Sequence, residues 1–370
     1  MSQALSLSDN SFEEISVAVP NAFANATYAL APRSIEEAAT VVQSAADQGL
    51  AIMPVGSGST LRSAEADIAL VTSHLRGIID YQPDDLTIVV GAGTTLAELD
   101  AALAPRQQSA ALPEVSPYRT VGGVVASGTS GYSRLRYGPT SDRVLEVVMA
   151  TGYGEVVHAG GRLVKNVTGY DLSRLVAGSY GSLGVIGSVC LKLWPAASVR
   201  RTVVIDNALV GLDTLYQPVA VLETENGTSA YIQGTERSVQ IDGDALGGVS
   251  SDGFIWPDPI RSPVLVDVRV PARLVPEALV VVRSMSPQRF VAQHGVGVIE
   301  TGFDSYDEPS LGELRAWARR SGGSVAVSAA GLSAEQRWGP ASGAIAVQRR
   351  ILDLFDPSGV CNPGIFSESS

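Results

Sequence analysis

Three separated clusters of glycine and other small residues constrain most strongly what this chain can fold into and bind. The first is Gly56-Ser57-Gly58-Ser59-Thr60, and the second is Gly122-Gly123 with Gly128, Gly131 and Gly138 behind it. The third is Gly169-Tyr-Asp-Leu172 through Gly178 to Ile186. Glycine permits left-handed turns and lets main-chain N–H groups approach a bound anion closely. One long ligand lying across two α+β units accounts for three such clusters better than a small phosphate does. Packing alone could still require some of these glycines.

The first cluster follows an apolar strand that we predict at residues 50–55, and its five small residues can direct several N–H groups at one anion. It is neither a Gly-x-Gly-x-x-Gly motif nor a Walker loop, so a plain turn remains an alternative. The second cluster opens a predicted helix with Thr120 as its N-cap. We expect the N–H groups of Gly122 and Gly123 to be free for a ligand there.

The order of helix and strand signals predicts an α+β fold with two lobes and a small α+β cap. Ser34-Ile-Glu-Glu37 and Thr95-Leu-Ala-Glu98 are capping boxes, and Gly49 should end the first helix. Glycine clusters become sparser after Pro195, which favours a separate cap. The expected divisions are a loose arm at 1–25, a first lobe at 26–105, a second lobe at 106–199, the cap at 200–335 and a return of the chain to the lobes at 336–370.

Charge and cysteine content exclude several classes of function. The net charge is −12, from 26 basic and 38 acidic residues, and no basic stripe is present that could bind nucleic acid. Two cysteines, Cys190 and Cys361, are too few for a disulfide framework or an iron–sulfur cluster. The first ten residues lack a secretory signal, and no apolar run reaches the roughly 18 residues of a membrane span. We therefore expect a soluble, cytoplasmic protein.

Several motifs carry a resemblance to a known family. They are Pro54-Val-Gly-Ser-Gly58, Thr120-Val-Gly-Gly123, Tyr137-Gly138, Lys165-Asn-Val-Thr-Gly-Tyr-Asp-Leu172, Gly181-Ser-Leu-Gly184-Val-Ile186 and Asn362-Pro-Gly364. Together they resemble the FAD-binding (PCMH-type) domain of the vanillyl-alcohol-oxidase superfamily. Within it, the motif at 165–172 and the chain length are most similar to the E subunits of bacterial glycolate oxidases. The similarity is dense over residues 30–195, thin through the cap, and present again at 350–366.

The resemblance implies that FAD binds across both lobes. Residues 54–60 would hold the pyrophosphate, 120–123 would wrap the flavin-side phosphates and ribityl chain, and 178–186 would line the adenosine and dimethylbenzene end. Asn362 would approach the isoalloxazine ring. The residues implied to bind FAD are Pro54, Val55, Gly56, Ser57, Gly58, Ser59, Thr60, Pro113, Thr120, Val121, Gly122, Gly123, Ser127, Gly128, Tyr132, Gly178, Gly181, Gly184, Val185, Ile186 and Asn362.

The same resemblance implies that FAD is bound without a covalent link. Many relatives tether the flavin through a histidine in the pyrophosphate loop, where this chain has Ser57-Gly58-Ser59. No cysteine lies between residues 115 and 140 either.

Oxidation of a 2-hydroxy acid at a flavin requires a base for the hydroxyl proton and a cation for the carboxylate. His294 is our candidate base, because Val291-Ala-Gln-His-Gly-Val-Gly297 resembles a reduced form of the His-Ala-Gly-x-Gly cap motif of hydroxy-acid dehydrogenases. Those relatives bind a metal with further ligands that are missing here, so we expect no metal. Arg134, Arg136 and Arg162 are candidate carboxylate-binding residues, although a solvated loop arginine is the alternative for each.

Two functional hypotheses therefore remain. In the first, the chain is an FAD-dependent subunit that oxidises glycolate or D-lactate and passes electrons to an iron–sulfur partner. In the second, it is a non-catalytic FAD-carrying assembly subunit, and a second FAD subunit performs the oxidation. A nicotinamide-dependent reductase is a weaker third possibility, since no nicotinamide-binding fingerprint is present.

Overall fold

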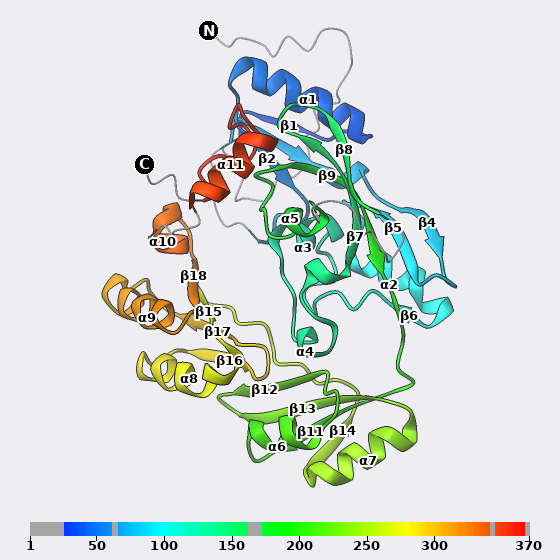
Figure 1. Cartoon of the computed structure of the whole chain (residues 1–370), viewed down its shortest axis with the longest axis vertical. Helices are drawn as coiled ribbons and strands as arrows, with labels where there is room; N and C mark the ends of the chain where they lie inside the picture. Colours follow the sequence, from blue (N-terminus) through cyan, green and yellow to red (C-terminus); the bar gives the residue numbers. More distant parts are fainter. Residues whose placement is uncertain (1–25, 61–65, 162–171, 341–344, 367–370) are drawn as a thin grey trace.

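A computed structural model describes residues 26–60, 66–161, 172–340 and 345–366 of the chain. The expected arm at 1–25, most of the 165–172 motif and Arg162 lie outside these described residues. Figure 1 shows two parts, which we call the body (residues 26–195) and the cap (residues 199–328). No helix among the described residues is long and apolar enough to cross a membrane.

The body contains a small parallel sheet that leads into the first glycine cluster. Its strand order is β1-β3-β2, with β1 at Tyr28–Leu30, β3 at Ile68–Val71 and β2 at Ile52–Val55. Helix α1 (Ile35–Gln48) packs beside these strands and ends at Gly49, whose φ of 65° is left-handed as predicted. Only half of the first capping box forms, because Glu37 accepts from the Arg33 N–H at 2.7 Å instead of reaching Ser34.

A five-stranded antiparallel sheet forms the rest of the body framework. Its order is β4-β5-β9-β7-β8, with β4 at Ile78–Gln82, β5 at Thr87–Gly91, β9 at Gly184–Lys192, β7 at Val144–Thr151 and β8 at Val156–Gly160. Because β5 pairs with β9, this sheet runs across the division expected at residue 105. The strands on either side of that position therefore share one hydrophobic core.

Short helices pack against this sheet and position the second and third glycine clusters. Helix α2 (Leu96–Leu103) begins with the complete capping box predicted at Thr95 and Glu98. Helix α3 (Val121–Ser127) begins at the predicted N-cap Thr120, and α5 (Leu172–Val176) ends before Gly178. The two-stranded ladder of β6 (Gln108–Ser109) and β10 (Trp194–Pro195) lies where the chain leaves the body.

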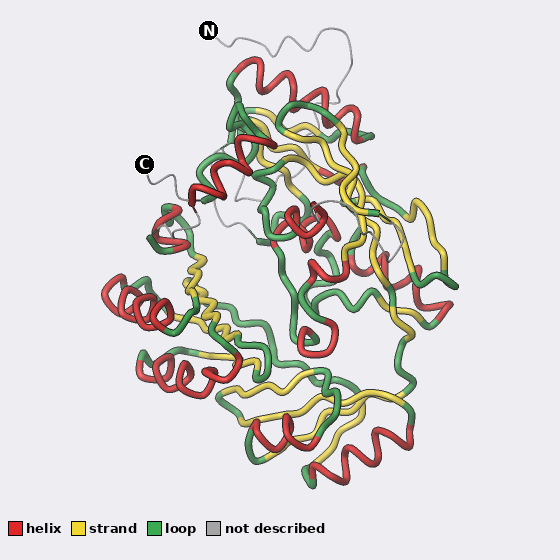
Figure 2. Tube along the Cα trace, in the orientation of Figure 1, coloured by secondary structure: helices red, strands yellow, loops and turns green. Residues whose placement is uncertain are grey.

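The cap is a single eight-stranded antiparallel sheet with helices on its outer face (Figure 2). The strand order is β14 (Val249–Asp252), β11 (Val199–Ile205), β13 (Gly227–Gly234), β12 (Ala220–Thr224), β16 (Arg289–Gln293), β17 (Val298–Phe303), β15 (Val264–Arg269) and β18 (Ser324–Ser328). The outer helices are α6 (Ala208–Thr214), α7 (Glu236–Leu246), α8 (Val275–Ser284) and α9 (Glu308–Arg320). The inner face of the sheet is directed toward the body.

The chain returns to the body through α10 (Ala334–Trp338) and α11 (Ile345–Phe355). Beyond α11 the tail runs beside β2, where the Ile52 N–H donates to the Val360 carbonyl and the Asn362 N–H donates to the Ile52 carbonyl, both at 2.7 Å. The buried carboxylate of Asp356 fixes this return, because it accepts from the Val360 N–H at 3.1 Å and the Cys361 N–H at 2.7 Å. The tail thus extends the parallel sheet.

We predict that Asp356→Ala lowers the free energy of unfolding by about 2–4 kcal/mol, because two buried N–H groups lose a charged acceptor. The measurement is urea unfolding followed by tryptophan fluorescence. Asp353→Ala is the matched control, since Asp353 lies in the last turn of α11, three residues before Asp356, and is exposed. An equal loss of stability in both variants would contradict the role of Asp356.

Candidate functional site

The three glycine clusters meet at one place in the body. A Cβ atom on Gly56 would lie 2.1 Å from Thr120 Oγ1, and one on Gly128 would lie 3.2 Å from the Cα of Gly178. A Cβ atom on Gly181 would lie 3.1 Å from Pro54 Cγ. The missing side chains therefore allow the three segments to touch one another, which the sequence pattern predicted.

A groove runs along this junction. Its lining comes from all three clusters and from one arginine: Pro54, Val55, Gly56, Ser57, Gly58, Ser59, Thr60, Arg119, Gly123, Ala126, Ser127, Tyr180 and Gly181. The N–H of Tyr180 donates to the Ala126 carbonyl at 2.8 Å, which joins the third cluster to α3. Gly58 has a φ of 66°, so the first cluster does turn through left-handed backbone.

The two glycines at the start of α3 have different roles, and the expectation of free N–H groups there is wrong. The Gly122 N–H donates to the Ala92 carbonyl at 2.8 Å, and the Gly123 N–H donates to Thr120 Oγ1 at 3.2 Å. Gly122 is required by packing, since a Cβ atom would lie 2.6 Å from the Cβ of Ala92. Gly123 faces the groove, and its only close neighbour would be the Thr120 hydroxyl, at 2.9 Å.

Arg119 is a groove residue that sequence reasoning missed. Its Nη2 donates to Thr60 Oγ1 at 2.7 Å and to the hydroxyls of Ser127 and Thr129 at 3.2 Å. Burial lowers the pKa of Arg119, and no carboxylate pairs with it among the described residues. A desolvated cation with only neutral partners attracts an anionic ligand. The sequence signal that could have identified Arg119 is its position directly before Thr120, the N-cap of α3.

Several residues implied to bind FAD lie behind the groove instead of lining it. Val185 pairs with Ala150 and Ile186 pairs with Met149, and both side chains belong to buried cores. At Gly184 a Cβ atom would lie 2.1 Å from the Ala150 carbonyl oxygen, so close strand packing explains that glycine. The others outside the lining of the groove and of the neighbouring cavities are Pro113, Thr120, Val121, Gly122 and Gly178.

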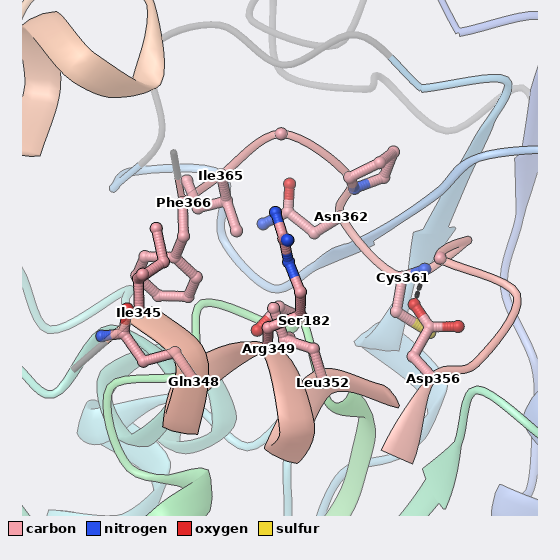
Figure 3. A pocket seen from close by; sticks show the side chains of 13 residues that line it. Ser182, Ile345, Gln348, Arg349, Leu352, Asp356, Cys361, Asn362, Ile365 and Phe366 are labelled. Carbon is pink, nitrogen blue, oxygen red and sulfur yellow. Dashed lines mark hydrogen bonds between the residues drawn. The ribbon is translucent and has the colours of Figure 1, made fainter. Parts of the chain in front are cut away.

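Asn362 lies in a separate cavity beneath the returning tail. Figure 3 shows it above α11, with Arg349 and Ser182 below it. Its Nδ2 donates to the Tyr180 carbonyl at 2.5 Å. Asn362 itself has a φ of 46°, and Tyr180 has a φ of 54°. The side chain expected to approach the flavin ring instead holds a strained residue of the groove in place.

A large cavity continues from the groove into the space between body and cap. It encloses about 1960 Å³ of space that is open to solvent, and it shares Ser59, Thr60, Arg119, Ser127 and Tyr180 with the groove. The body contributes Gly128, Tyr132 and Arg134 to its wall, among other residues. The cap contributes side chains from β15, β16, β17 and β18.

The structure describes two of the predicted carboxylate-binding arginines, Arg134 and Arg136, and of these Arg134 lines the cavity. Both residues lie on α4 (Arg134–Tyr137), a single turn that reaches from the body toward β12 (Figure 1). Arg136 is used elsewhere, because its Nη1 donates to the Gln217 carbonyl of the cap at 2.9 Å. Tyr137 accepts a hydrogen bond from Gln233 of β13. Arg136 and Tyr137 therefore join body to cap, and the prediction that Arg136 faces the substrate is wrong.

His294 does not face the cavity, so the structure contradicts its assignment as the base. The ring Nε2 lies 2.9 Å from Glu223 Oε2, and Arg283 of α8 lies 2.8 Å from Glu223 Oε1. Side chains alternate between the two faces of a strand, and Gln293 takes the inner face. His294 follows in the turn after β16, where its buried ring contacts Glu223 on the outer side of the sheet.

The inner face of the cap sheet carries polar groups that sequence reasoning missed. Asp267 of β15 is the direct cross-strand partner of Glu300 of β17, and Arg269 lies two residues along the same strand. Gln293 is 3% exposed and donates from Nε2 to Glu300 Oε1 at 3.1 Å. Burial, together with the Asp267 charge, raises the pKa of Glu300 to about 8, and burial also raises the pKa of Asp267. At neutral pH this carboxyl pair holds a proton.

Arg134 and Arg269 approach this carboxyl pair from opposite sides of the cavity. Burial lowers the pKa of Arg134, and the charge of Arg269 lowers it further. The two guanidinium groups therefore repel each other electrostatically. Neither forms a hydrogen bond or a salt bridge with another described residue, although Asp142 acts electrostatically on Arg134, and Arg269 acts on Asp267 and Glu300. Two unpaired cations facing one space form a binding site for an anion. No group of three or more His, Cys, Asp or Glu side chains in the described part of the chain could hold a metal ion.

Known proteins that are similar to this chain include FAD-binding proteins, in agreement with the groove described above. Residues 26–160 match the family model of the FAD binding domain. The chain is 31% identical to the glycolate oxidase subunit GlcE of Escherichia coli K12 over 305 residues, which cover 78% of this chain and 84% of that protein. It is 32% identical to the glycolate oxidase subunit GlcD of Bacillus subtilis over 184 residues, and 30% identical to the D-2-hydroxyglutarate dehydrogenase of Xanthomonas citri over 216 residues. These two matches cover only 38% and 45% of those proteins.

The fold has a counterpart among solved structures. Alkyldihydroxyacetonephosphate synthase superposes with a TM-score of 0.63 at 17% identity, over 90% of this chain and 76% of that one. The predicted α+β flavoprotein fold and the predicted resemblance are confirmed. The chain belongs to the glycolate oxidase subunit GlcE family of FAD-binding oxidoreductase proteins.

Proposed function

We propose that this chain is an FAD-carrying subunit that itself oxidises a small 2-hydroxy acid to the 2-oxo acid. The observation that carries the proposal is the pair of unpartnered arginines, Arg134 and Arg269, on opposite walls of the cavity that continues from the FAD groove. The names of the relatives, glycolate oxidase subunits and a D-2-hydroxyglutarate dehydrogenase, support this substrate class.

The groove residues fit FAD. Arg119 supplies a desolvated cation whose described partners are all hydroxyl groups, and it lies beside the small-residue loop at 56–60. That combination suits a pyrophosphate, which needs positive charge and close backbone approach. Gly123 leaves room along the same wall. Bound FAD would supply the two-electron acceptor for the substrate C–H bond.

Arg134 and Arg269 would hold the substrate carboxylate between body and cap. Each guanidinium can pair with both oxygens of a carboxylate, and the binding of one anion would relieve the repulsion between the two cations. Arg136 and Tyr137 keep α4 against the cap, so the distance between the two arginines is set by contacts outside the cavity.

The carboxyl pair of Asp267 and Glu300 would accept the substrate hydroxyl proton in place of His294. The pair holds a proton at neutral pH, and Glu300 becomes a free base once it ionises, above about pH 8. Gln293 orients Glu300 from the neighbouring strand.

Electrons would leave through partner subunits. The sequence has two cysteines, both buried, which cannot bind an iron–sulfur cluster alone. We propose an iron–sulfur subunit and a second FAD subunit as partners, in the cytoplasm, with any membrane contact made through them. Anaerobic bleaching of the flavin by glycolate or D-lactate in the isolated chain tests the proposal. A flavin that stays oxidised under every hydroxy acid would favour the carrier hypothesis.

Gly123→Val should abolish FAD retention while leaving the chain folded, because the added side chain occupies the groove. The measurement is the ratio of flavin to protein absorbance after gel filtration, with circular dichroism as the test of folding. Gly312→Val in α9 is the control, since its side chain would meet open space. Full flavin occupancy in the Gly123 variant would refute the placement of FAD.

Glu300→Gln should slow flavin reduction about 100-fold, which is the usual contribution of a general base. In the wild type the reduction rate should rise as the pH passes through about 8, because a carboxyl with a raised pKa is ionised only above it. The groups that face Glu300 are Asp267, Arg269, Gln293, Glu114 and Tyr132.

Asp267→Asn removes the repelling charge and should move the rise in rate to lower pH. Anaerobic stopped-flow absorbance between about pH 6 and 9 measures both effects, with Glu313→Gln on the exposed face of α9 as the control. A pH profile that is the same in wild type and Glu300→Gln would exclude Glu300 as the base.

A further inference from the structure

Arg337 also lines the cavity, and neither the pyrophosphate nor the Arg134–Arg269 pair accounts for it. Arg337 of α10 is only 8% exposed, and its guanidinium has no hydrogen-bond or ion-pair partner among the residues that the structure describes. The guanidinium borders the cavity, and a cation that is largely shielded from water and has no counterion favours an anionic ligand.

The backbone of Arg337 is held firmly in this position. Helix α10 begins with a complete capping box between Ser333 and Gln336. Arg315 of α9 donates to the Gln336 carbonyl, and the indole N–H of Trp338 donates to the Ile365 carbonyl at 2.6 Å. The Trp338 ring also packs edge-on against Tyr180, with 5.3 Å between centroids. The helix is therefore anchored to the cap, the tail and the groove at once.

The position of Arg337 separates it from the pyrophosphate end of the groove. It lines the cavity between body and cap, but it is not among the residues around the loop at 56–60, whereas Arg119 lines both spaces. Burial raises the pKa of Tyr180, and the charges of Arg269 and Arg337 oppose this rise. Arg119 acts on Tyr180 in the same direction, so all three arginines lie within electrostatic range of this tyrosine, and it is the lining of the two spaces that distinguishes Arg337 from Arg119.

We infer that the cavity takes a 2-hydroxy acid with a second acidic group, and that Arg337 binds that group while Arg134 and Arg269 hold the carboxylate beside the hydroxyl. This inference rests on the proposed function. It assigns Arg337 to substrate specificity, and it makes a hydroxy dicarboxylate such as D-malate or D-2-hydroxyglutarate a better ligand than glycolate or D-lactate.

The test is calorimetric binding to the FAD-loaded protein with its flavin reduced under anaerobic conditions, so that no ligand is oxidised. Wild type should bind D-2-hydroxyglutarate at least about tenfold more tightly than D-lactate, the gain expected from one charge-assisted contact. Arg337→Met should remove this preference and leave D-lactate binding within about twofold. Arg337→Lys should restore part of it. Arg134→Met should weaken both ligands alike.

Two results would overturn the inference. One is equal affinity for the two classes of acid in the wild type, and the other is a loss of bound FAD in Arg337→Met, which would assign the arginine to the cofactor phosphates. Failure of the proposed function has a different signature. D-2-hydroxyglutarate would then bind with the Arg337-dependent preference, but the oxidised flavin would not bleach with any hydroxy acid.

Discussion

The contact of three backbone segments, made possible by the absence of side chains, is the constraint on which the rest of the structure depends. A Cβ atom on Gly56 would clash with Thr120, and Cβ atoms on Gly128 and Gly181 would lie unusually close to Gly178 and Pro54. A groove with backbone walls forms between these segments, and Arg119 provides its charge. Because the segments belong to two different sheets and their helices, the groove exists only once the whole body has folded.

The cap adds ionisable and polar side chains next to this groove. Its inner face places two carboxyl groups, one amide and one arginine beside the end of the groove. Removing these groups from water costs free energy, and burial accordingly raises the pKa of Glu300. Arg134 and Arg269 also lack a hydrogen bond or salt bridge to any described residue. An anionic substrate that pairs with those cations would lower this desolvation free energy. Because one cation lies on the body and the other on the cap, substrate binding would depend on how the two parts are positioned.

Local sequence signals predicted much of the body. Capping residues at Thr95 and Thr120 and the left-handed stop at Gly49 depend on neighbours within four positions, so the sequence alone reveals them. The cap site could not be predicted in this way. Whether His294 or Gln293 faces the body depends on which side of β16 the outer helices cover, and the pairing of Asp267 with Glu300 depends on strand register. Likewise, the N–H groups of Gly122 and Gly123 are satisfied by Ala92 and Thr120, which a motif search does not reveal.

The pairing of Ile52 with Cys361 has a consequence for biosynthesis. The parallel sheet beside the small-residue loop gains its last neighbour from a segment at the opposite end of the described chain. A ribosome must therefore translate the entire cap before that edge of the sheet can be covered, and contacts between such distant segments form slowly. Until then the nascent body exposes an unpaired strand edge to other proteins, so chaperone binding during translation would protect it at this stage.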